Sequence, residues 1–231
     1  MKTRIRIQGL LITGLTLGAL LFYKFFFLYW RQERFDEIAD FIGVLFLLLG
    51  YLIRLSARGD KSLRSKGGHI LVTDGLYREM RNPMYLGTIC IGSGIVLILF
   101  KFWVFLAMLA VLFMIYEIQT RKEEQFLLTQ FGQDYQNYKA ATPKYFPKRI
   151  KVFLAHITNP SLLEWPRLKK EIRSFLGVFL GVAFVEAYAD ARAFGFNGIV
   201  HELIEFIWII AALLLVLYLI ARIQLKFSKA L

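Results

Sequence analysis

Five long apolar stretches restrict the fold of this chain more than any other feature of its sequence. Four of them have about the length that one helix needs to cross a bilayer, roughly 20 mainly apolar residues. These four are Gly9–Trp30, Ile38–Leu55, Ile172–Tyr188 and Leu203–Ile220, and the fifth, Met84–Tyr116, is too long for one crossing. Since 57% of the 231 residues are hydrophobic, a soluble domain of this size has too little interior to bury them.

Lys101 divides the longest stretch near its middle, and we expect a tight hairpin of two spans there. The chain then has about six spans. The predicted fold class is all-α, a polytopic transmembrane helical bundle, because helices satisfy their own backbone hydrogen bonds in lipid.

The basic residues predict how these spans are oriented. With a cytoplasmic N-terminus, 24 of the 29 lysines and arginines fall on the cytoplasmic side, the bias that is typical of membrane proteins. We therefore expect both termini, and the long polar segments Ala57–Pro83 and Glu117–Glu171, to face the cytoplasm. The net charge of +12 gathers beside the spans, as expected for contact with anionic membrane lipids, so nucleic-acid binding is not predicted.

The first polar segment contains a pattern with candidate functional residues. It reads Gly-Gly-His-Ile-Leu-Val-Thr-Asp-Gly-Leu-Tyr from Gly67 to Tyr77, and continues with Arg-Glu-Met-Arg-Asn-Pro-Met-Tyr-Leu-Gly. Asp74-Gly75 is a turn signal, and Pro83 suits the first turn of the span that follows. Taken alone, the stretch is equally compatible with a basic loop that enters a membrane helix.

The second polar segment begins with two adjacent carboxylates just after a span ends. Arg121-Lys122-Glu123-Glu124 is followed by Phe-Gly-Gln-Asp-Tyr-Gln-Asn-Tyr from residue 131 and by Pro-Lys-Tyr-Phe-Pro from residue 143. Carboxylates near membrane depth are costly unless a cation or water meets them. The simpler alternative is a solvated helix end whose charges pair three and four residues apart.

Together the two patterns resemble the isoprenylcysteine carboxyl methyltransferase and phospholipid methyltransferase superfamily of integral membrane enzymes. The shared features are His-x-Leu-Val, Gly-x-Tyr, Arg-His-Pro-x-Tyr, a Glu-Glu pair and Phe-Gly-x-x-Tyr-x-x-Tyr, over about residues 62–147. Asn82 stands where such enzymes usually have histidine. The resemblance implies a methyltransferase core with four spans over residues 1–150, and it leaves residues 151–231 as a C-terminal extension with two further spans.

The resemblance also implies a cofactor, S-adenosylmethionine, in a cytoplasmic pocket made by loops and helix ends. A carboxylate there could accept hydrogen bonds from the ribose hydroxyls or the ammonium of the cofactor. Tyrosine rings could face its sulfonium or adenine. The residues that match the cofactor-binding positions are His69, Leu71, Val72, Tyr77, Asn82, Pro83, Met84, Tyr85 and Glu123.

The implied acceptor of the methyl group is lipidic or otherwise partitioned into the membrane: an isoprenylcysteine carboxylate, a phospholipid amine or a small thiol. A carboxylate is ionised near neutral pH and needs only a cation to place it, and Arg121 is the predicted catalytic residue for that role. An amine acceptor would instead need a base, for which Glu124 is the candidate. The position of Arg121 beside the glutamate pair favours the carboxylate.

Other kinds of protein remain compatible with the sequence. Steroid-reductase-like membrane enzymes that use NADPH share a similar Arg-x-Pro-x-Tyr segment, although the Glu123-Glu124 pair favours a methyltransferase. A membrane scaffold or small transporter is the non-enzymatic alternative, but the spans lack an obvious polar pathway for transport. No metal site is predicted, because His201, Glu202 and Glu205 have no second ligand cluster.

Overall fold

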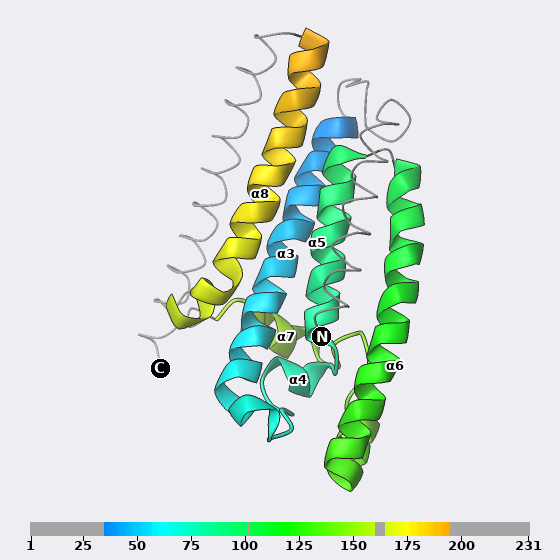
Figure 1. The fold of residues 1–231 in the computed structure, drawn as a ribbon, viewed down its shortest axis with the longest axis vertical. Coiled ribbons are helices and arrows are strands. Elements are labelled where there is room, and N and C mark those ends of the chain that lie inside the picture. The colour runs from blue at the N-terminus through cyan, green and yellow to red at the C-terminus, as the bar shows by residue number, and fades with distance from the viewer. Residues whose placement is uncertain (1–34, 101, 160–164, 195–231) are drawn as a thin grey trace.

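The computed structural model describes residues 35–100, 102–159 and 165–194, and these ranges are helical without a strand. The predicted all-α class is confirmed for this part of the chain. In Figure 1, α3, α5 and α8 lie side by side, while α4 and α7 lie near the end of the bundle beyond which α6 extends. The elements are α3 (Phe35–Arg64), a 3₁₀ helix η1 (Lys66–Gly68), α4 (Leu76–Glu79), α5 (Pro83–Leu99), α6 (Phe102–Ala141), α7 (Ile150–Ile157) and α8 (Trp165–Phe194).

The longest apolar stretch forms two helices, as its predicted division requires. The first helix ends at Leu99 and the second begins at Phe102, while a hairpin of two membrane spans stays a prediction. Within the described ranges, two helical segments, Ile38–Arg64 and Phe102–Ala141, are long and apolar enough to cross a membrane, and α5 is a shorter apolar helix of 17 residues. These features fit a membrane protein.

Two of the predicted spans, Gly9–Trp30 and Leu203–Ile220, lie outside the described residues. The predicted span Ile172–Tyr188 lies within α8. The six-span arrangement, the cytoplasmic termini and the division at residue 150 therefore stay predictions.

Glycines allow α3 and α5 to pack with their backbones in contact. A Cβ atom added to Gly50 would lie 2.6 Å from the carbonyl oxygen of Gly87, and one added to Gly94 would lie 2.5 Å from that of Gly43. Only a residue without a side chain fits at such distances. Small residues at helix interfaces are a common route to close packing in membranes, where van der Waals contact takes the place of the hydrophobic effect.

Helix α6 has an apolar half and a polar half. Its apolar half leaves large side chains such as Phe113 and Met114 more than half exposed, as expected for a surface solvated by lipid. Beyond Tyr116 the helix continues as a polar segment to Ala141. Gly132 interrupts it with a φ of 53°, a backbone conformation that glycine adopts without steric cost.

The segment after α6 folds back onto the start of α5. The backbone N–H of Arg81 donates to the carbonyl of Pro143 at 2.9 Å, and that of Lys148 donates to the carbonyl of Glu79 at 2.9 Å. The Glu79 side chain is fully buried and forms an ion pair with Arg149. These contacts bring the two sequence patterns together at one end of the bundle.

Candidate functional site

Glu123 of α6 is surrounded by one polar side chain from each of three other helices. The hydroxyl of Tyr85, on α5, donates a hydrogen bond to Glu123 Oε2 at 2.7 Å. Lys61 Nζ, on α3, lies 3.7 Å from Glu123 Oε1. Tyr77, on α4, is close enough for the charge of Glu123 to act on its hydroxyl. We call these four residues the Glu123 cluster.

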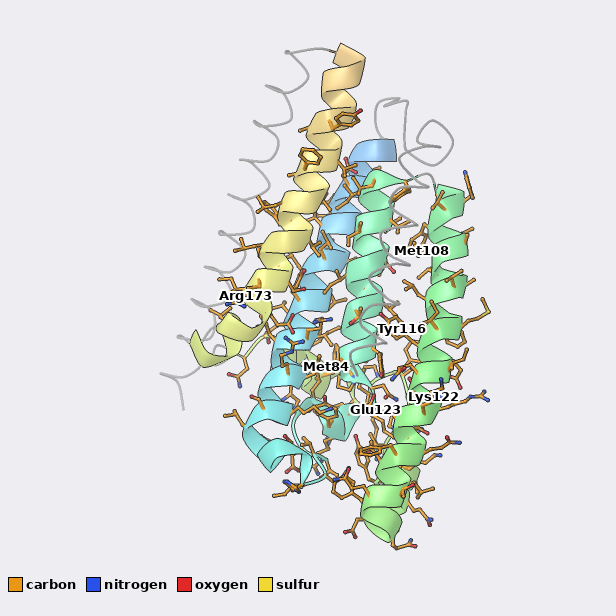
Figure 2. All side chains as sticks on the ribbon, viewed as in Figure 1. Met84, Met108, Tyr116, Lys122, Glu123 and Arg173 are labelled. Carbon is orange, nitrogen blue, oxygen red and sulfur yellow. The ribbon has the colours of Figure 1, made fainter. Side chains whose placement is uncertain are left out.

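The direction of Glu123 follows from the helical period of α6. Figure 2 shows Glu123 and Tyr116 on the side of α6 that faces α5, whereas Lys122 points away from the bundle. Residues 116 and 123 are two turns apart, so they share one face of the helix. The cluster therefore lies between α6 and the rest of the bundle.

The hydroxyl of Tyr77 resists ionisation at this site. Burial raises the pKa of its hydroxyl far above the ordinary range, and the nearby Glu123 carboxylate raises it further. Its backbone carbonyl accepts a hydrogen bond of 2.7 Å from the hydroxyl of Tyr138. This contact explains the second tyrosine of the Phe-Gly-x-x-Tyr-x-x-Tyr pattern, because it ties α4 to the polar half of α6.

Glu124 has partners different from those of its neighbour in sequence. Its carboxylate lies 3.4 Å from Arg81 Nη2 and 3.3 Å from Lys139 Nζ, with the side chain 12% exposed. Arg81 Nε and Nη1 are buried and have no hydrogen-bond partner within the described ranges. The site thus contains a buried cation with donors to spare.

The segment before α5 is positioned by the loop that follows α6. The side-chain amide of Asn82 donates to the carbonyl of Lys144 at 3.1 Å. Pro83 is buried in the first turn of α5, as predicted, and Met84 is half-buried against the hydrophobic core. Asn82, which replaces the usual histidine, therefore serves here as a bridge between the two patterns.

The loop after η1 lies near the surface. His69 is exposed, while Leu71 and Val72 are half-buried and have no regular secondary structure. Gln130 Nε2 donates to the carbonyl of Gly68 at 2.8 Å, so the start of this loop is tied to α6. The structure brings Tyr77 and Tyr85 to Glu123 but shows no direct contact of His69 with that carboxylate.

Arg121 lies apart from the Glu123 cluster. Its side chain is 73% exposed, and its Nε is 2.8 Å from the carboxylate of Glu117, one turn earlier on α6. Lys144 and Tyr145 also donate to Glu117, and with Arg121 they lower the pKa of Glu117 to about 2. The predicted role of Arg121 in holding the acceptor stays a prediction.

A second polar cluster lies on α3, α5 and α8, and the sequence patterns did not predict it. Arg54 Nη1 donates to the hydroxyl of Thr88 at 2.9 Å. Its Nε and Nη2 donate to the two carboxylate oxygens of Glu171, at 3.2 and 3.3 Å. Arg58 Nε is 2.9 Å from the same carboxylate. We call Arg54, Arg58, Thr88 and Glu171 the Arg54 cluster.

Tyr116 connects the two clusters. Its ring centroid is 5.1 Å from that of Tyr85, and its hydroxyl interacts with Thr88 and with the charge of Arg54. The signal that could have revealed Arg54 is its position inside an otherwise apolar helix, where a charge is costly and therefore often functional. Because Arg54 lies near the end of the predicted span, it was counted among the basic residues on the cytoplasmic side.

Carboxylates, tyrosines and a mostly buried arginine at one end of an apolar helical bundle are the features of an integral membrane enzyme. The family model described as phospholipid methyltransferase matches residues 13–134, more than half of the chain, and the protein belongs to this family. This membership favours the methyltransferase expectation over the reductase and scaffold alternatives.

One curated relative is the protein-S-isoprenylcysteine O-methyltransferase of Schizosaccharomyces pombe. The two sequences are 32% identical over 111 residues, which are 44% of this chain and 47% of the relative. The match therefore spans about half the length of that relative. No solved structure matches the chain.

Proposed function

We propose that this protein uses S-adenosylmethionine to methylate the carboxylate of an isoprenylated cysteine at the cytoplasmic face of a membrane. The observation that carries the proposal is the position of Arg54. Thr88 and Tyr116 link this arginine to the cluster around Glu123. The activity named for the relative from Schizosaccharomyces pombe supports the same acceptor class.

The Glu123 cluster fits the polar parts of the cofactor. Glu123 keeps 36% of its side chain exposed, so its carboxylate can still accept hydrogen bonds from hydroxyl or ammonium groups. The two free nitrogens of Arg81 suit the carboxylate of the methionine part. When bound, S-adenosylmethionine supplies a methyl group that its sulfonium makes electrophilic.

Arg54 can hold a carboxylate acceptor without giving up its structural contacts. A guanidinium has five N–H groups, and the hydrogen bonds from Arg54 to Glu171 and Thr88 use three of them. One N–H group remains on Nη1 and one on Nη2. These two can form the paired hydrogen bonds by which arginine binds carboxylates.

The remaining residues orient the reactants and limit access of water. A carboxylate acceptor needs no base because it is already ionised near neutral pH. Tyr77 stays protonated and can donate a hydrogen bond, while the contact between the aromatic rings of Tyr85 and Tyr116 joins the two clusters. In this arrangement catalysis comes mainly from alignment and from exclusion of water.

Two arginine variants test the proposal in purified protein reconstituted in lipid discs. Arg54→Ala should lower turnover of a farnesylated cysteine by about tenfold to a hundredfold, the scale of a lost charge-assisted contact, while the cofactor Kd stays unchanged. Lysine should restore part of the activity, since it cannot form the two-pronged contact. Arg121→Ala is the matched comparison. A larger loss for Arg121→Ala than for Arg54→Ala would return the acceptor role to Arg121.

The phospholipid methyltransferase description of the matched family supports a second candidate, N-methylation of a lipid amine. Glu124 would then be the base, although Arg81 and Lys139 already engage its carboxylate. Under this candidate, phosphatidylethanolamine is the better acceptor, and Glu124→Gln lowers its turnover by roughly a hundredfold. Turnover of both acceptors by the wild type distinguishes the candidates.

A further inference from the structure

The carboxylate that holds Arg54 comes from outside the part of the chain that defines the family. Glu171 belongs to α8, whereas the family match ends at residue 134. Its side chain is almost fully buried, with 2% of the residue exposed. A buried carboxylate requires a cation, and here it has two, Arg54 and Arg58.

The geometry of the contact restricts the guanidinium of Arg54. The two oxygens of Glu171 bind Nε and Nη2, which lie along one edge of the planar group. Thr88 binds Nη1 from another helix. A planar group held at three of its nitrogens can neither rotate nor shift freely, so its remaining N–H groups keep one direction.

The charge of the cluster remains positive. Two arginines share a single carboxylate, so the contact orients Arg54 without cancelling the charge that an anionic acceptor requires.

Contacts other than the ion pair also hold α8 against α3. The Tyr51 hydroxyl donates to the carbonyl of Ser174 at 2.9 Å, and the Tyr51 and Phe175 rings meet edge to face at 5.0 Å.

We propose that Glu171 is a positioning residue for the acceptor site, and that the C-terminal extension thereby takes part in methyl transfer. It acts through Arg54, which it holds in the orientation that aligns the acceptor carboxylate. The proposal rests on the proposed function of Arg54. It assigns α8 a role in acceptor alignment that the family core does not provide.

Glu171→Gln in the full-length protein tests this role by a split between kcat and KM. Glutamine keeps the shape of the side chain but presents an N–H group to one guanidinium nitrogen. Arg54 therefore loses one of its two hydrogen bonds to residue 171. With farnesylcysteine as acceptor, kcat should fall at least tenfold, while KM for the acceptor and the cofactor Kd change less than threefold. Glu171→Asp should recover part of kcat because it restores the charge.

Tyr51→Phe is the control for docking of α8 alone. It removes the hydrogen bond to Ser174 next to the ion pair and should leave kcat within twofold of the wild type. Equal kcat losses in both variants, or a Glu171→Gln protein with the kcat of the wild type, would overturn the positioning role while the proposed function stands. A wild type that does not methylate farnesylcysteine would overturn both proposals.

Discussion

The carboxylate of Glu123 accepts a hydrogen bond from the Tyr85 hydroxyl and forms an ion pair with Lys61, and its side chain remains partly exposed. We expect Glu123→Gln to weaken binding of S-adenosylmethionine by about tenfold or more, because a charge-assisted hydrogen bond contributes roughly 1.5–3 kcal/mol. Isothermal titration of the purified protein measures the effect. Tyr85→Phe, which removes the 2.7 Å contact, should cause a smaller loss.

Lys122→Gln is the matched control for this titration. Lys122 precedes Glu123 on α6 but points away from the bundle (Figure 2). Its substitution should leave the dissociation constant within twofold. An unchanged dissociation constant in a folded Glu123→Gln protein would remove Glu123 from the cofactor site.

At the scale of single residues, the sequence predicted the members of the site that belong to a recognisable pattern. Tyr85 and Glu123 lie 38 positions apart, yet both were predicted, and the structure joins them by a hydrogen bond. Lys61 and Arg54 were missed. Arg54 lies at the end of an apolar stretch and Lys61 lies in the polar segment that follows it. The positive-inside bias already explains basic residues at both places, so composition could not single them out.

Among the helices, the contact between α3 and α5 depends on missing side chains. Gly50→Ala would place a methyl group 2.6 Å from the carbonyl oxygen of Gly87 and 2.7 Å from Ile91 Cγ1. Overpacking of this kind typically costs about 1–3 kcal/mol. We therefore expect a lower midpoint of thermal unfolding for Gly50→Ala, measured on the purified protein in detergent.

The same substitution at Gly177 of α8 provides the comparison. An added Cβ there meets no heavy atom within 4 Å, and alanine favours a helix over glycine. Gly177→Ala should leave the midpoint unchanged or raise it. Equal decreases of the unfolding midpoint in both variants would show that the close α3–α5 contact does not cause the destabilisation by Gly50→Ala.

The junction between α6 and the loop that follows it should be sensitive to acid. Lys144, then Tyr145 and Arg121, lower the pKa of Glu117 from 4.5 to about 2. A carboxylate with a lowered pKa in the folded state contributes stability that is complete above its unfolded value and disappears as the pH falls toward 2. The midpoint of thermal unfolding should therefore fall below about pH 5.

Glu117→Gln tests this assignment because it removes the titrating group and keeps the shape. The variant should unfold at a lower temperature than the wild type at pH 7, and the difference should shrink as the pH approaches 3. Asp134→Asn, at an exposed position on the same helix, is the control. A constant difference from pH 7 to pH 3 would contradict the assignment.

The break between α5 and α6 was predictable because one charged residue interrupts a stretch too long for one crossing. The docking of α8 on α3 was not predictable. Its contacts join Arg54 and Glu171, 117 positions apart, and neither residue lies in a local pattern that names its partner. Periodicity indicates which residues form helices, but the choice of neighbour depends on close contacts such as those of Gly50 and Gly87.

For the whole molecule, the main prediction concerns orientation. Single cysteines introduced at Lys66, Lys148 and Lys229, after removal of Cys90, should resist membrane-impermeant thiol reagents in intact cells. A cysteine at Lys101 should react, because this residue lies at the predicted outer turn. Ready labelling at any of the first three positions would overturn the six-span prediction.

The buried ion pair between α3 and α8 also sets an order of events during synthesis. Arg54 leaves the ribosome 117 residues before Glu171, its only carboxylate partner within the described ranges. At 5–20 residues per second, this interval is on the order of ten seconds. During that time, Arg54 must remain near water or lipid headgroups. Under the proposed function, the early helices therefore enter the membrane before the acceptor site is complete, and translation of α8 completes it.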